Sequence, residues 1–367
     1  MQHLLSKKYK YITFDDLAER ERCKSDPKLF LSETGDYVIL DEIQYVPEIL
    51  SYIKIAIDRQ RQRRGRFIVT GSQQFQLIKN LGDTLAGRIC LLNLLPLSRA
   101  EISSFKTSPA NTAAFAAACL RGSHPELIAY PKLDHDKWYS AYLRTYIERD
   151  VQGLHGVGSL LDFQKFMRLL AGRCAQPLNL SVIANDLGVA VSTIKNWVSI
   201  LVASQVVFLL PPYYKNFGKR VTKNPKVYFT DCGLVTYLTG TKSRELVLYG
   251  PLAGPLFENY CIQELLKSYY AAGILPEISY YRAHQGLEID LLIRANGKIV
   301  PFEIKLSKTP NKNMLQNIEK ARKLSGEFDP KNGGIISLGD DTYKITQSDK
   351  VYSLPEFLKT AIKIEKQ

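Results

Sequence analysis

Two carboxylates follow a short apolar run near the start of the chain, where the segment 37–40 leads into Asp41 and Glu42. If this run is a strand of a parallel sheet, both acids lie at its carboxyl edge, where ligands bind in open α/β folds. In a nucleotide hydrolase the first acid of such a pair holds Mg²⁺, commonly through water, and the second activates the attacking water. Asp41 is thus a candidate metal and nucleotide ligand, and both acids are candidate catalytic residues. The alternative is a strand end that turns to solvent.

Hydroxyl groups and an arginine follow the next apolar runs. Thr70 and Ser72 come directly after the run 66–69, where a polar side chain can sense a γ-phosphate beside the acid pair. Arg88 ends the sequence LAGR at 85–88 and can supply a guanidinium that stabilises charge. We therefore take Thr70 and Ser72 as candidate cofactor-binding residues, and Ser72 and Arg88 as candidate catalytic residues.

A second set of acids, with a lysine, lies toward the other end of the chain. Two alternating strands joined by a tight turn are expected at 287–293 and 299–305. Because side chains alternate along a strand, Glu303 and Lys305 share one face. Asp290 on the neighbouring strand can meet them there.

Glu258 lies in the helical segment LFENYCIQELL and can close this group. Together with Asp290, Glu303 and Lys305 it resembles the PD-(D/E)xK nuclease superfamily, although Ile289 stands in place of the proline. In that superfamily the acids hold Mg²⁺ and the lysine positions or activates water for attack on a phosphodiester. The resemblance implies that all four residues are catalytic and that the three acids are metal ligands. A spare acid–lysine pair on an edge strand is the alternative.

A glycine between two helical patterns indicates a helix-turn-helix. The first pattern spans 180–189 with Gly188 at its turn, the second opens at Ser192 as the expected N-cap, and 205–210 would form the hairpin behind it. Such a helix pair reads DNA with the start of its second helix, although winged helices also dock proteins. The candidate nucleic-acid contacts are Ser192, Thr193, Lys195 and Asn196.

A stretch of basic and aromatic residues follows, suited to contacts with phosphates. A solvated charged loop is the alternative interpretation. The aromatic residues are Tyr213, Tyr214 and Phe217, and the basic ones are Lys215, Lys219, Arg220, Lys223 and Lys226. Lys215, Lys219 and Arg220 are the nucleic-acid contacts that we expect here, and a second basic cluster comprises Arg59, Arg61, Arg63, Arg64 and Arg66.

The composition is that of an ordinary globular protein with an excess of positive charge. The 367 residues suffice for two or three domains, and 49 Lys and Arg against 36 Asp and Glu give a net charge of +13. Hydrophobic residues at 45% and charged residues at 23% exclude a disordered or fibrous chain. The charge suggests a polyanionic partner, DNA before a membrane, with a merely soluble basic surface as the alternative.

Targeting signals and cysteine clusters are not found in the sequence. The first residues have no apolar core of signal-peptide length, and no run reaches about 18 apolar residues. The six cysteines have no CxxC pair and do not cluster with the five histidines, which predicts reduced cysteines and argues against a zinc site. We expect a cytoplasmic protein without membrane association.

Apolar runs alternate with helical periodicity in the first hundred residues, which is typical of a parallel sheet covered by helices. Strands are expected at 9–14, 37–40, 66–69 and 89–95, and a helix opens at 47–50. The chain is mostly helical from residue 100 to about residue 170. Strands and helices alternate again after about residue 252.

These segments closely resemble, in order and over almost the whole chain, the AAA-type P-loop ATPases of bacteria and archaea that carry a C-terminal domain of unknown function. The resemblance rests on YITFDD, YVILDEIQYVPEIL, RFIVTGSQQFQL, LAGRI and LLPLSRAEI, and later on YLRTYIERDV, PKVYFTDCGL, LFENYCIQELL and GLEIDLLI. It implies ATP and Mg²⁺ as cofactors, an ATPase site at Asp41, Glu42, Ser72 and Arg88, and a homo-oligomer.

One departure from that family concerns the phosphates. The family's Walker A loop, GxxxxGK(S/T), cradles them with backbone amides and should lie a few dozen residues before the strand 9–14. The 367 residues contain no such string. The chain thus resembles the family without its first strand, its phosphate loop and most of its first helix, and we expect impaired ATP hydrolysis.

We therefore predict an α/β chain in three parts. Residues 1–100 form an N-terminally truncated P-loop NTPase (AAA-type) parallel sheet, residues 101–245 a helical region with a winged helix at about 160–212, and residues 246–367 a PD-(D/E)xK nuclease-like α/β domain. The predicted function is that of an AAA-type ATP-binding protein associated with DNA. The alternatives are a Mg²⁺-dependent nuclease and a non-catalytic scaffold that binds DNA or protein.

Overall fold

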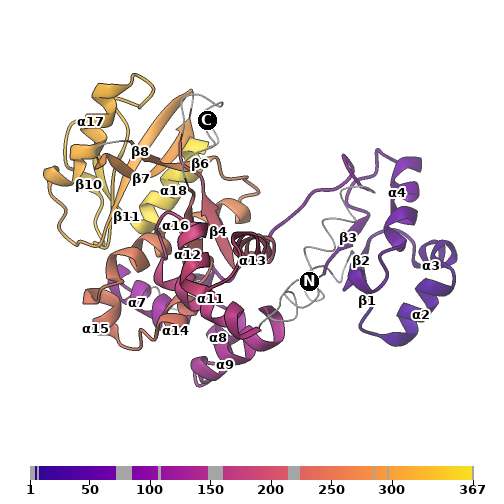
Figure 1. Cartoon of the computed structure of the whole chain (residues 1–367). Helices are drawn as coiled ribbons and strands as arrows, with labels where there is room; N and C mark the ends of the chain where they lie inside the picture. Colours follow the sequence, from indigo (N-terminus) through magenta and orange to yellow (C-terminus); the bar gives the residue numbers. More distant parts are fainter. Residues whose placement is uncertain are drawn as a thin grey trace. The chain divides into compact units, whose positions relative to one another are not determined.

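A computed structural model describes residue 5 and residues 8–71, 85–105, 109–147, 160–213, 224–283, 286–295 and 297–365. The chain folds into two compact units, Met1–Leu91 and Leu92–Gln367, whose elements are drawn in Figure 1. Each unit combines helices with a sheet, so the protein is of mixed α/β class.

Three parallel strands form the sheet of the first unit. They are ordered β1 (Lys10–Thr13), β2 (Val38–Asp41) and β3 (Phe67–Val69), and the register pairs Thr13 with Asp41. Val38 to Leu40 of β2 are fully buried because the central strand is covered on both faces. Three of the four expected strands are confirmed.

Helices connect these strands and cover the sheet. Between β1 and β2 the chain forms α2 (Leu17–Ser25) and α3 (Pro27–Thr34), and after β2 it forms the short 3-10 helix η1 (Ile43–Tyr45) and α4 (Ile49–Arg59). The carboxylate of Asp16 caps α2 and that of Asp26 caps α3. Ile49 and Ile53 of α4, one helical turn apart, are buried against the sheet.

The fourth strand predicted for this region, at 89–95, is wrong. These residues have neither helix nor strand structure, and they include the boundary between the units at Leu91 and Leu92. Leu92 is 80% exposed and Leu94 is 87% exposed. An apolar run becomes a buried strand only when neighbouring strands pair with it, and the sequence of the run does not reveal whether they do.

The second unit begins with helices. In chain order they are α6 (Arg99–Phe105), α7 (Asn111–Arg121), α8 (Pro125–Ala129), α9 (His135–Tyr142), the π-helical turn η2 (Leu143–Ile147) and α11 (Leu160–Gly172). This confirms the predicted helical content between residues 100 and 170 within the described residues. The sheet of the unit lies later in the sequence.

A bent helix pair follows, with the expected glycine at the bend. Helices α12 (Leu180–Leu187) and α13 (Val191–Ala203) meet at 112°, and Gly188 adopts a left-handed conformation (φ 68°) that favours glycine. The predicted N-cap at Ser192 is wrong. The helix begins one residue earlier, and Ala190 has the extended backbone of the N-cap without a side-chain bond.

Two antiparallel strands follow the helix pair in the sequence. Strand β4 (Val207–Leu210) pairs with β5 (Lys226–Phe229), and all four residues of β5 are buried. The chain continues into α14 (Cys232–Thr239) and α15 (Arg244–Tyr249). Strand β5 therefore lies in the interior of the unit, with α14 directly after it.

The last part of the chain forms a six-stranded mixed sheet. Its strands are ordered β10 (Tyr343–Lys344), β11 (Lys350–Ser353), β9 (Gly334–Ser337), β8 (Lys298–Lys305), β7 (Glu288–Ala295) and β6 (Ile278–Arg282). The predicted hairpin is β7 and β8, whose register pairs Leu291 with Phe302. The associated helices are α16 (Ala253–Ala271), the 3-10 helix η5 (Lys312–Leu315), α17 (Gln316–Leu324) and α18 (Leu354–Glu365).

One apolar core runs through most of the second unit. It includes Phe115 of α7, Trp197 of α13, Phe257 of α16, Phe302 of β8 and Phe357 of α18. A smaller cluster packs α17 on the sheet through Ile299, Ile318 and Ile335. The predicted helical and C-terminal parts are thus packed around a common core, and the boundary predicted between them at residues 245 and 246 stays a prediction.

Among the described residues, each single helix falls short of the length and apolarity that crossing a bilayer requires. The bent pair α12 and α13 meets that requirement by length and composition alone. Ile194 and Trp197 of this pair are buried in the core of the unit, whereas Val182 and Val191 are exposed.

Asn259 of α16 is the buried residue on which β5 depends. Its side chain accepts the Phe229 N–H at 2.7 Å and donates to the Phe229 carbonyl at 3.0 Å. Asn259→Ala leaves both backbone groups unpaired in the interior, so we expect the unfolding free energy to fall by about 2–4 kcal/mol in urea denaturation. Lys359→Ala, at an exposed position of α18, should change it by less than about 0.5 kcal/mol. Equal effects of the two variants would contradict this role.

Candidate functional sites

The acid pair of the first unit lies at the carboxyl edge of the parallel sheet, as predicted. Asp41 ends β2, and its carboxylate accepts hydrogen bonds from the Tyr11 hydroxyl at 2.5 Å and from the Thr70 hydroxyl. The backbone N–H of Ile43 donates to the Thr70 carbonyl at 3.0 Å, which holds the ends of β2 and β3 together. The hydrogen bond to Asp41, with a smaller effect of burial, raises the pKa of Tyr11.

Glu42 has an uncommon backbone conformation directly after Asp41. Its φ of 55° and ψ of 46° are left-handed, and the Gln44 side chain donates a hydrogen bond to its carboxylate. A non-glycine residue in this region stores strain, and such residues cluster at active sites. The conformation turns the chain sharply where the strand ends.

Arg88, which was also predicted for this site, pairs with a different carboxylate. The Arg88 guanidinium binds both carboxylate oxygens of Asp58 on α4, at 2.7 and 3.0 Å, and donates to the Ala86 carbonyl. Ser72 lies outside the described residues. The site as described therefore consists of Asp41 and Glu42 with the hydroxyl groups of Thr70 and Tyr11.

The oxygen atoms at this edge suit Mg²⁺, a hard cation that prefers carboxylate and hydroxyl ligands. Asp41 is half-buried and its two oxygens are aligned by hydroxyl donors from the neighbouring strands. The triphosphate of a nucleotide needs a set of backbone amides as well, and the Walker A string that would supply them does not occur in these 367 residues. The residues present thus fit the metal and leave the phosphates without their usual cradle.

All four residues predicted near the C-terminus lie in one cluster. Lys305 Nζ is 2.6 Å from Glu303 and 3.0 Å from Asp290, on the neighbouring strand. Asp290 also accepts the backbone N–H of Ile304 at 2.9 Å. Glu258 of α16 is linked to these residues by Lys226 of β5.

Two members of this cluster were not predicted. Lys226 Nζ lies 2.9 Å from Glu258, 2.7 Å from Glu288 and 3.8 Å from Asp290. Strand alternation could have placed Glu288 in the cluster, since it is two residues before Asp290 on β7. No sequence pattern could have placed Lys226 there, because β5 is distant in sequence from α16 and β7. We call Lys226, Glu258, Glu288, Asp290, Glu303 and Lys305 the acid–lysine cluster.

Burial and mutual charge shift the pKa values in this cluster. Burial, together with the charge of Asp290, raises the pKa of Glu258 to about 7 and that of Glu303 to about 8. Burial opposes the ionisation of Asp290, but the ammonium groups of Lys305 and Lys226 hold its pKa below the usual value. The carboxylates outweigh the effect of burial on both lysines, whose pKa values are raised.

The predicted nucleic-acid residues are only partly described. On α13, Ser192, Lys195 and Asn196 are exposed and Thr193 is half-buried. Lys215, Lys219 and Arg220 lie outside the described residues. Lys226 is only 2% exposed and is bound by the cluster acids, so its predicted place in a phosphate-binding stretch is wrong.

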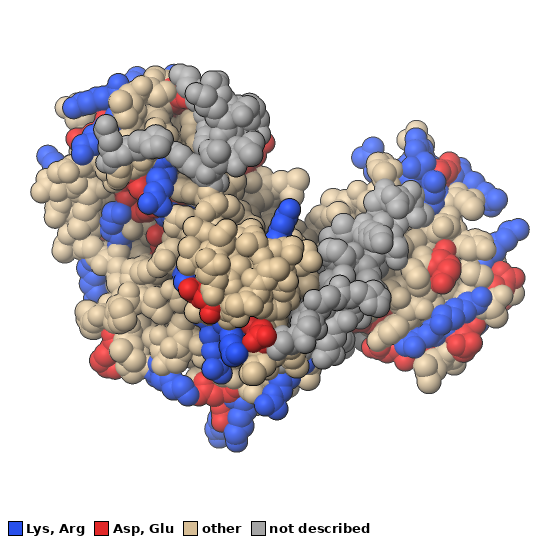
Figure 2. Space-filling view, viewed as in Figure 1, with Lys and Arg blue, Asp and Glu red and all other residues tan. Residues whose placement is uncertain are grey.

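Three of the five arginines at 59–66 are paired with acids. Arg66 is buried and binds Asp36 at 2.6 Å, and Arg63 binds the same carboxylate at 2.9 Å. Arg61 lies 3.3 Å from Asp58. On the described part of the face drawn in Figure 2, positive and negative side chains are interspersed over both units.

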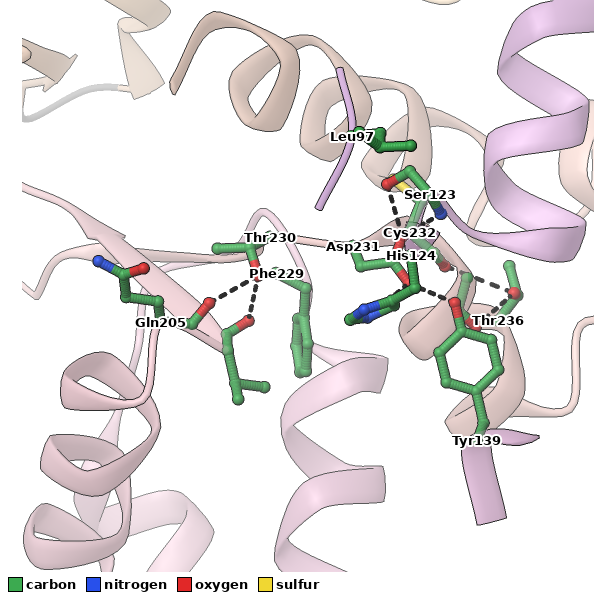
Figure 3. Close-up of polar contacts among 12 residues, drawn as sticks. Leu97, Ser123, His124, Tyr139, Gln205, Phe229, Thr230, Asp231, Cys232 and Thr236 are labelled. Atoms are coloured by element: carbon green, nitrogen blue, oxygen red, sulfur yellow. Dashed lines mark hydrogen bonds and ion pairs between the residues drawn. The ribbon is translucent and has the colours of Figure 1, made fainter. Parts of the chain in front are cut away.

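A buried polar network that sequence analysis missed surrounds Asp231, directly after β5 (Figure 3). Its carboxylate accepts the backbone N–H and the hydroxyl of Ser123 at 2.9 and 3.0 Å, and the hydroxyl of Tyr139. His124 Nε2 lies 3.7 Å away, and burial lowers the pKa of His124. Lys267 of α16 donates to the Ser123 hydroxyl at 2.9 Å. The network connects α9, α14 and α16 with the residues that follow α7.

Comparison with protein families divides the chain into three matched regions. Residues 1–103 match an AAA domain, residues 112–245 a domain of unknown function (DUF8612), and residues 253–357 a second domain of unknown function (DUF4143). The first unit, with its acid-ended parallel sheet, is therefore an AAA-type domain. The chain thus combines an AAA domain with C-terminal domains of unknown function.

Three curated relatives are similar to this chain and are described as uncharacterized proteins. Those of Mycobacterium tuberculosis and Mycobacterium bovis are each 29% identical over 288 residues, which cover 78% of this chain and 62% of the relative. One from Methanocaldococcus jannaschii is 22% identical over 335 residues, covering 85% of this chain and 71% of the relative. The chain thus spans less than two thirds of the length of the mycobacterial proteins.

A solved structure was also matched, the crystal structure of a Vibrio cholerae protein. It is 11% identical and covers 88% of this chain and 71% of its own, with a TM-score of 0.20. A score this low supports no statement about the fold or function of this chain.

Two glycines allow the network around Asp231 to close. A Cβ at Gly233 would overlap the Tyr139 hydroxyl and the backbone of Gly122. We expect Gly233→Ala to lower the unfolding free energy by at least about 2 kcal/mol in urea denaturation, because backbone and a buried ring must move. Gly254→Ala is the matched control, since it also lies in a first helical turn and has open space around it. The control should be neutral or stabilising by up to about 1 kcal/mol. A loss in the control as large as in Gly233→Ala would contradict the explanation.

Proposed function

We propose that this protein is an AAA-type ATP-binding protein of the ATPase class, with a catalytic edge formed by Asp41 and Glu42, and that ATP hydrolysis is impaired in the chain as given because it has no Walker A string. The supporting observation is the position of Asp41 at the carboxyl end of a central parallel strand, where Tyr11 and Thr70 orient its two oxygens. The AAA domain match over residues 1–103 supports the same class of protein.

The residues of this edge have separate roles in the proposal. Asp41 would hold hydrated Mg²⁺, and Thr70 would fix the carboxylate by the hydrogen bond that it donates. Glu42 would accept a proton from the attacking water, and its left-handed backbone directs it away from the line of β2. ATP and Mg²⁺, when bound, would supply the phosphoanhydride bond and the charge that polarises it.

Because the 367 residues contain no Walker A string, we expect a low affinity for ATP. Titration of the chain as given with a fluorescent ATP analogue should show weak binding, with a Kd of about 1 mM or weaker. If the reading frame upstream of Met1 encodes a GxxxxGK(S/T) loop, the longer protein should bind at least about tenfold more tightly. Tight binding of ATP by the chain as given would contradict the expectation.

Glu42→Gln tests the catalytic edge. The substitution is made in whichever protein hydrolyses ATP, the chain as given or the longer one. The substitution removes the proton acceptor and keeps the shape of the side chain, so kcat should fall about 10²–10⁴-fold while the affinity for ATP is kept. Phosphate release measures the rate, and Glu21→Gln, at an exposed position of α2, is the control. Hydrolysis at the parental rate in Glu42→Gln would overturn the assignment.

DNA association is the second part of the proposal, through the start of α13. Ser192, Lys195 and Asn196 are exposed there, and polar side chains at the start of a second helix suit a DNA groove. Charge gives little support, because Asp186 and Lys195 are the only charged residues within α12 and α13. Docking of a protein on this face is the alternative.

Lys195→Ala distinguishes these possibilities. If Lys195 contacts a phosphate, the substitution should weaken binding of duplex DNA and reduce the slope of log Kd against log salt by about 1. Fluorescence anisotropy over a series of salt concentrations measures both quantities. Lys165→Ala of α11 removes the same net charge from a lysine paired with Asp162, and an equal effect there would contradict a specific contact.

A Mg²⁺-dependent nuclease at the acid–lysine cluster is the alternative function for this chain. The convergence of Glu258, Asp290, Glu303 and Lys305 favours it. Lys226 weighs against it, since its ammonium lies among the acids that would have to bind the metal. We therefore propose the ATPase rather than the nuclease. A plasmid-nicking assay with Mg²⁺ tests the nuclease alternative.

A further inference from the structure

The ammonium of Lys226 lies where the acid–lysine cluster would hold a cation. It is within 3 Å of carboxylate oxygens from two different elements, Glu258 of α16 and Glu288 of β7, and 3.8 Å from Asp290. Carboxylate oxygens from separate elements that converge on one point are the usual surroundings of a bound divalent cation. Here the converging point is already taken by a positive charge of the chain itself.

The backbone of Lys226 is fixed on both sides. Lys226 pairs with Leu210 in the β4 and β5 ladder, and on its other side it forms a bridge with Pro177. The residue is 2% exposed, and its ammonium also faces the ring of Tyr280 at 5.4 Å. To leave the acids, the ammonium would have to remain buried without its partners, which is strongly unfavourable.

The second lysine balances the remaining charge. Lys305 binds Asp290 and Glu303 from the side of β8, so Asp290 lies between two ammonium groups. The buried Oε1 of Glu303 has no hydrogen-bond partner. Among the described residues, no group of three or more acidic, histidine or cysteine side chains has an arrangement that could hold a metal ion. The cluster as it stands does not fit a divalent metal.

We propose that Lys226 is the resident cation of the acid–lysine cluster and takes the place of a divalent metal. In the wild-type protein the cluster then binds neither Mg²⁺ nor Mn²⁺ at physiological concentrations. Removal of the ammonium creates a divalent-cation site from Glu258, Glu288 and Asp290. This inference is independent of the ATPase assignment, which concerns the other unit.

Titration with Mn²⁺, followed by electron paramagnetic resonance of the free ion, tests the proposal on the second unit's acids within the full chain. Because the AAA-type edge also has oxygen ligands, every protein in the test carries Asp41→Asn. With that background, the otherwise wild-type chain should show no Mn²⁺ site, and addition of Lys226→Met should produce one. Asp290→Asn added to Lys226→Met should remove the new site.

Thermal unfolding gives a second measurement on the same proteins. Lys226→Met leaves the acids uncompensated, so its midpoint should fall, and millimolar Mn²⁺ should raise it again by several degrees. Lys267→Met is the matched control, because Lys267 is equally buried and contacts a single carboxylate, that of Glu264. The control should lose stability without recovery in Mn²⁺.

The proposal can be tested even if one of the variants does not fold. A Mn²⁺ site in the chain with Lys226 intact that Asp290→Asn abolishes would overturn the proposal. Failure of folded Lys226→Met, and of the second variant Lys226→Gln, to bind Mn²⁺ would also overturn it. If neither variant folds without metal, refolding in Mn²⁺ should restore them, and failure to do so counts against the site.

Discussion

Helix α16 is buried almost all round, and this burial requires its polar side chains to find partners within the second unit. Glu258 and Asn259 bind side-chain and backbone groups of β5. Glu264 and Lys267, further along the helix, bind Arg99 N–H and Ser123. Gln263 is the exception, with both of its amide atoms buried and without a partner. The strand and the helices that precede α16 in the chain are therefore fixed to it by polar contacts as well as by the apolar core.

Local patterns were sufficient where the partners of a residue are close in sequence or follow from strand alternation. The three strands of the AAA-type domain, the acid pair at the end of β2 and the hairpin of β7 and β8 were all predicted in this way. The meeting of Asp290, Glu303 and Lys305 follows from a tight turn and the period of two. Several residues of both candidate sites could therefore be predicted from the sequence alone.

Two of the errors and one omission share a different cause, since the deciding neighbour is distant in sequence or is absent among the described residues. The run 89–95 is apolar enough for a strand, but it finds no partner and leaves Leu92 and Leu94 exposed. Lys226 was grouped with the basic residues before it, although the acids that bury it come from α16 and β7. Tyr11 is invisible as a site residue for the same reason, because only the parallel pairing of β1 and β2 brings its hydroxyl to Asp41. A charge or a hydroxyl has no local signature that reveals its partner.

The acid–lysine cluster also crosses the line that family comparison draws through the chain. Lys226 belongs to the region matched at 112–245, whereas Glu258, Glu288 and Asp290 belong to the region matched at 253–357. Without the first region, Glu258 and Glu288 would lose the buried ammonium of Lys226, and Lys305 would remain the lysine bound to Asp290 and Glu303. The charges of the cluster are thus compensated only when both regions are present, and removal of one partner leaves an uncompensated buried charge in the other region.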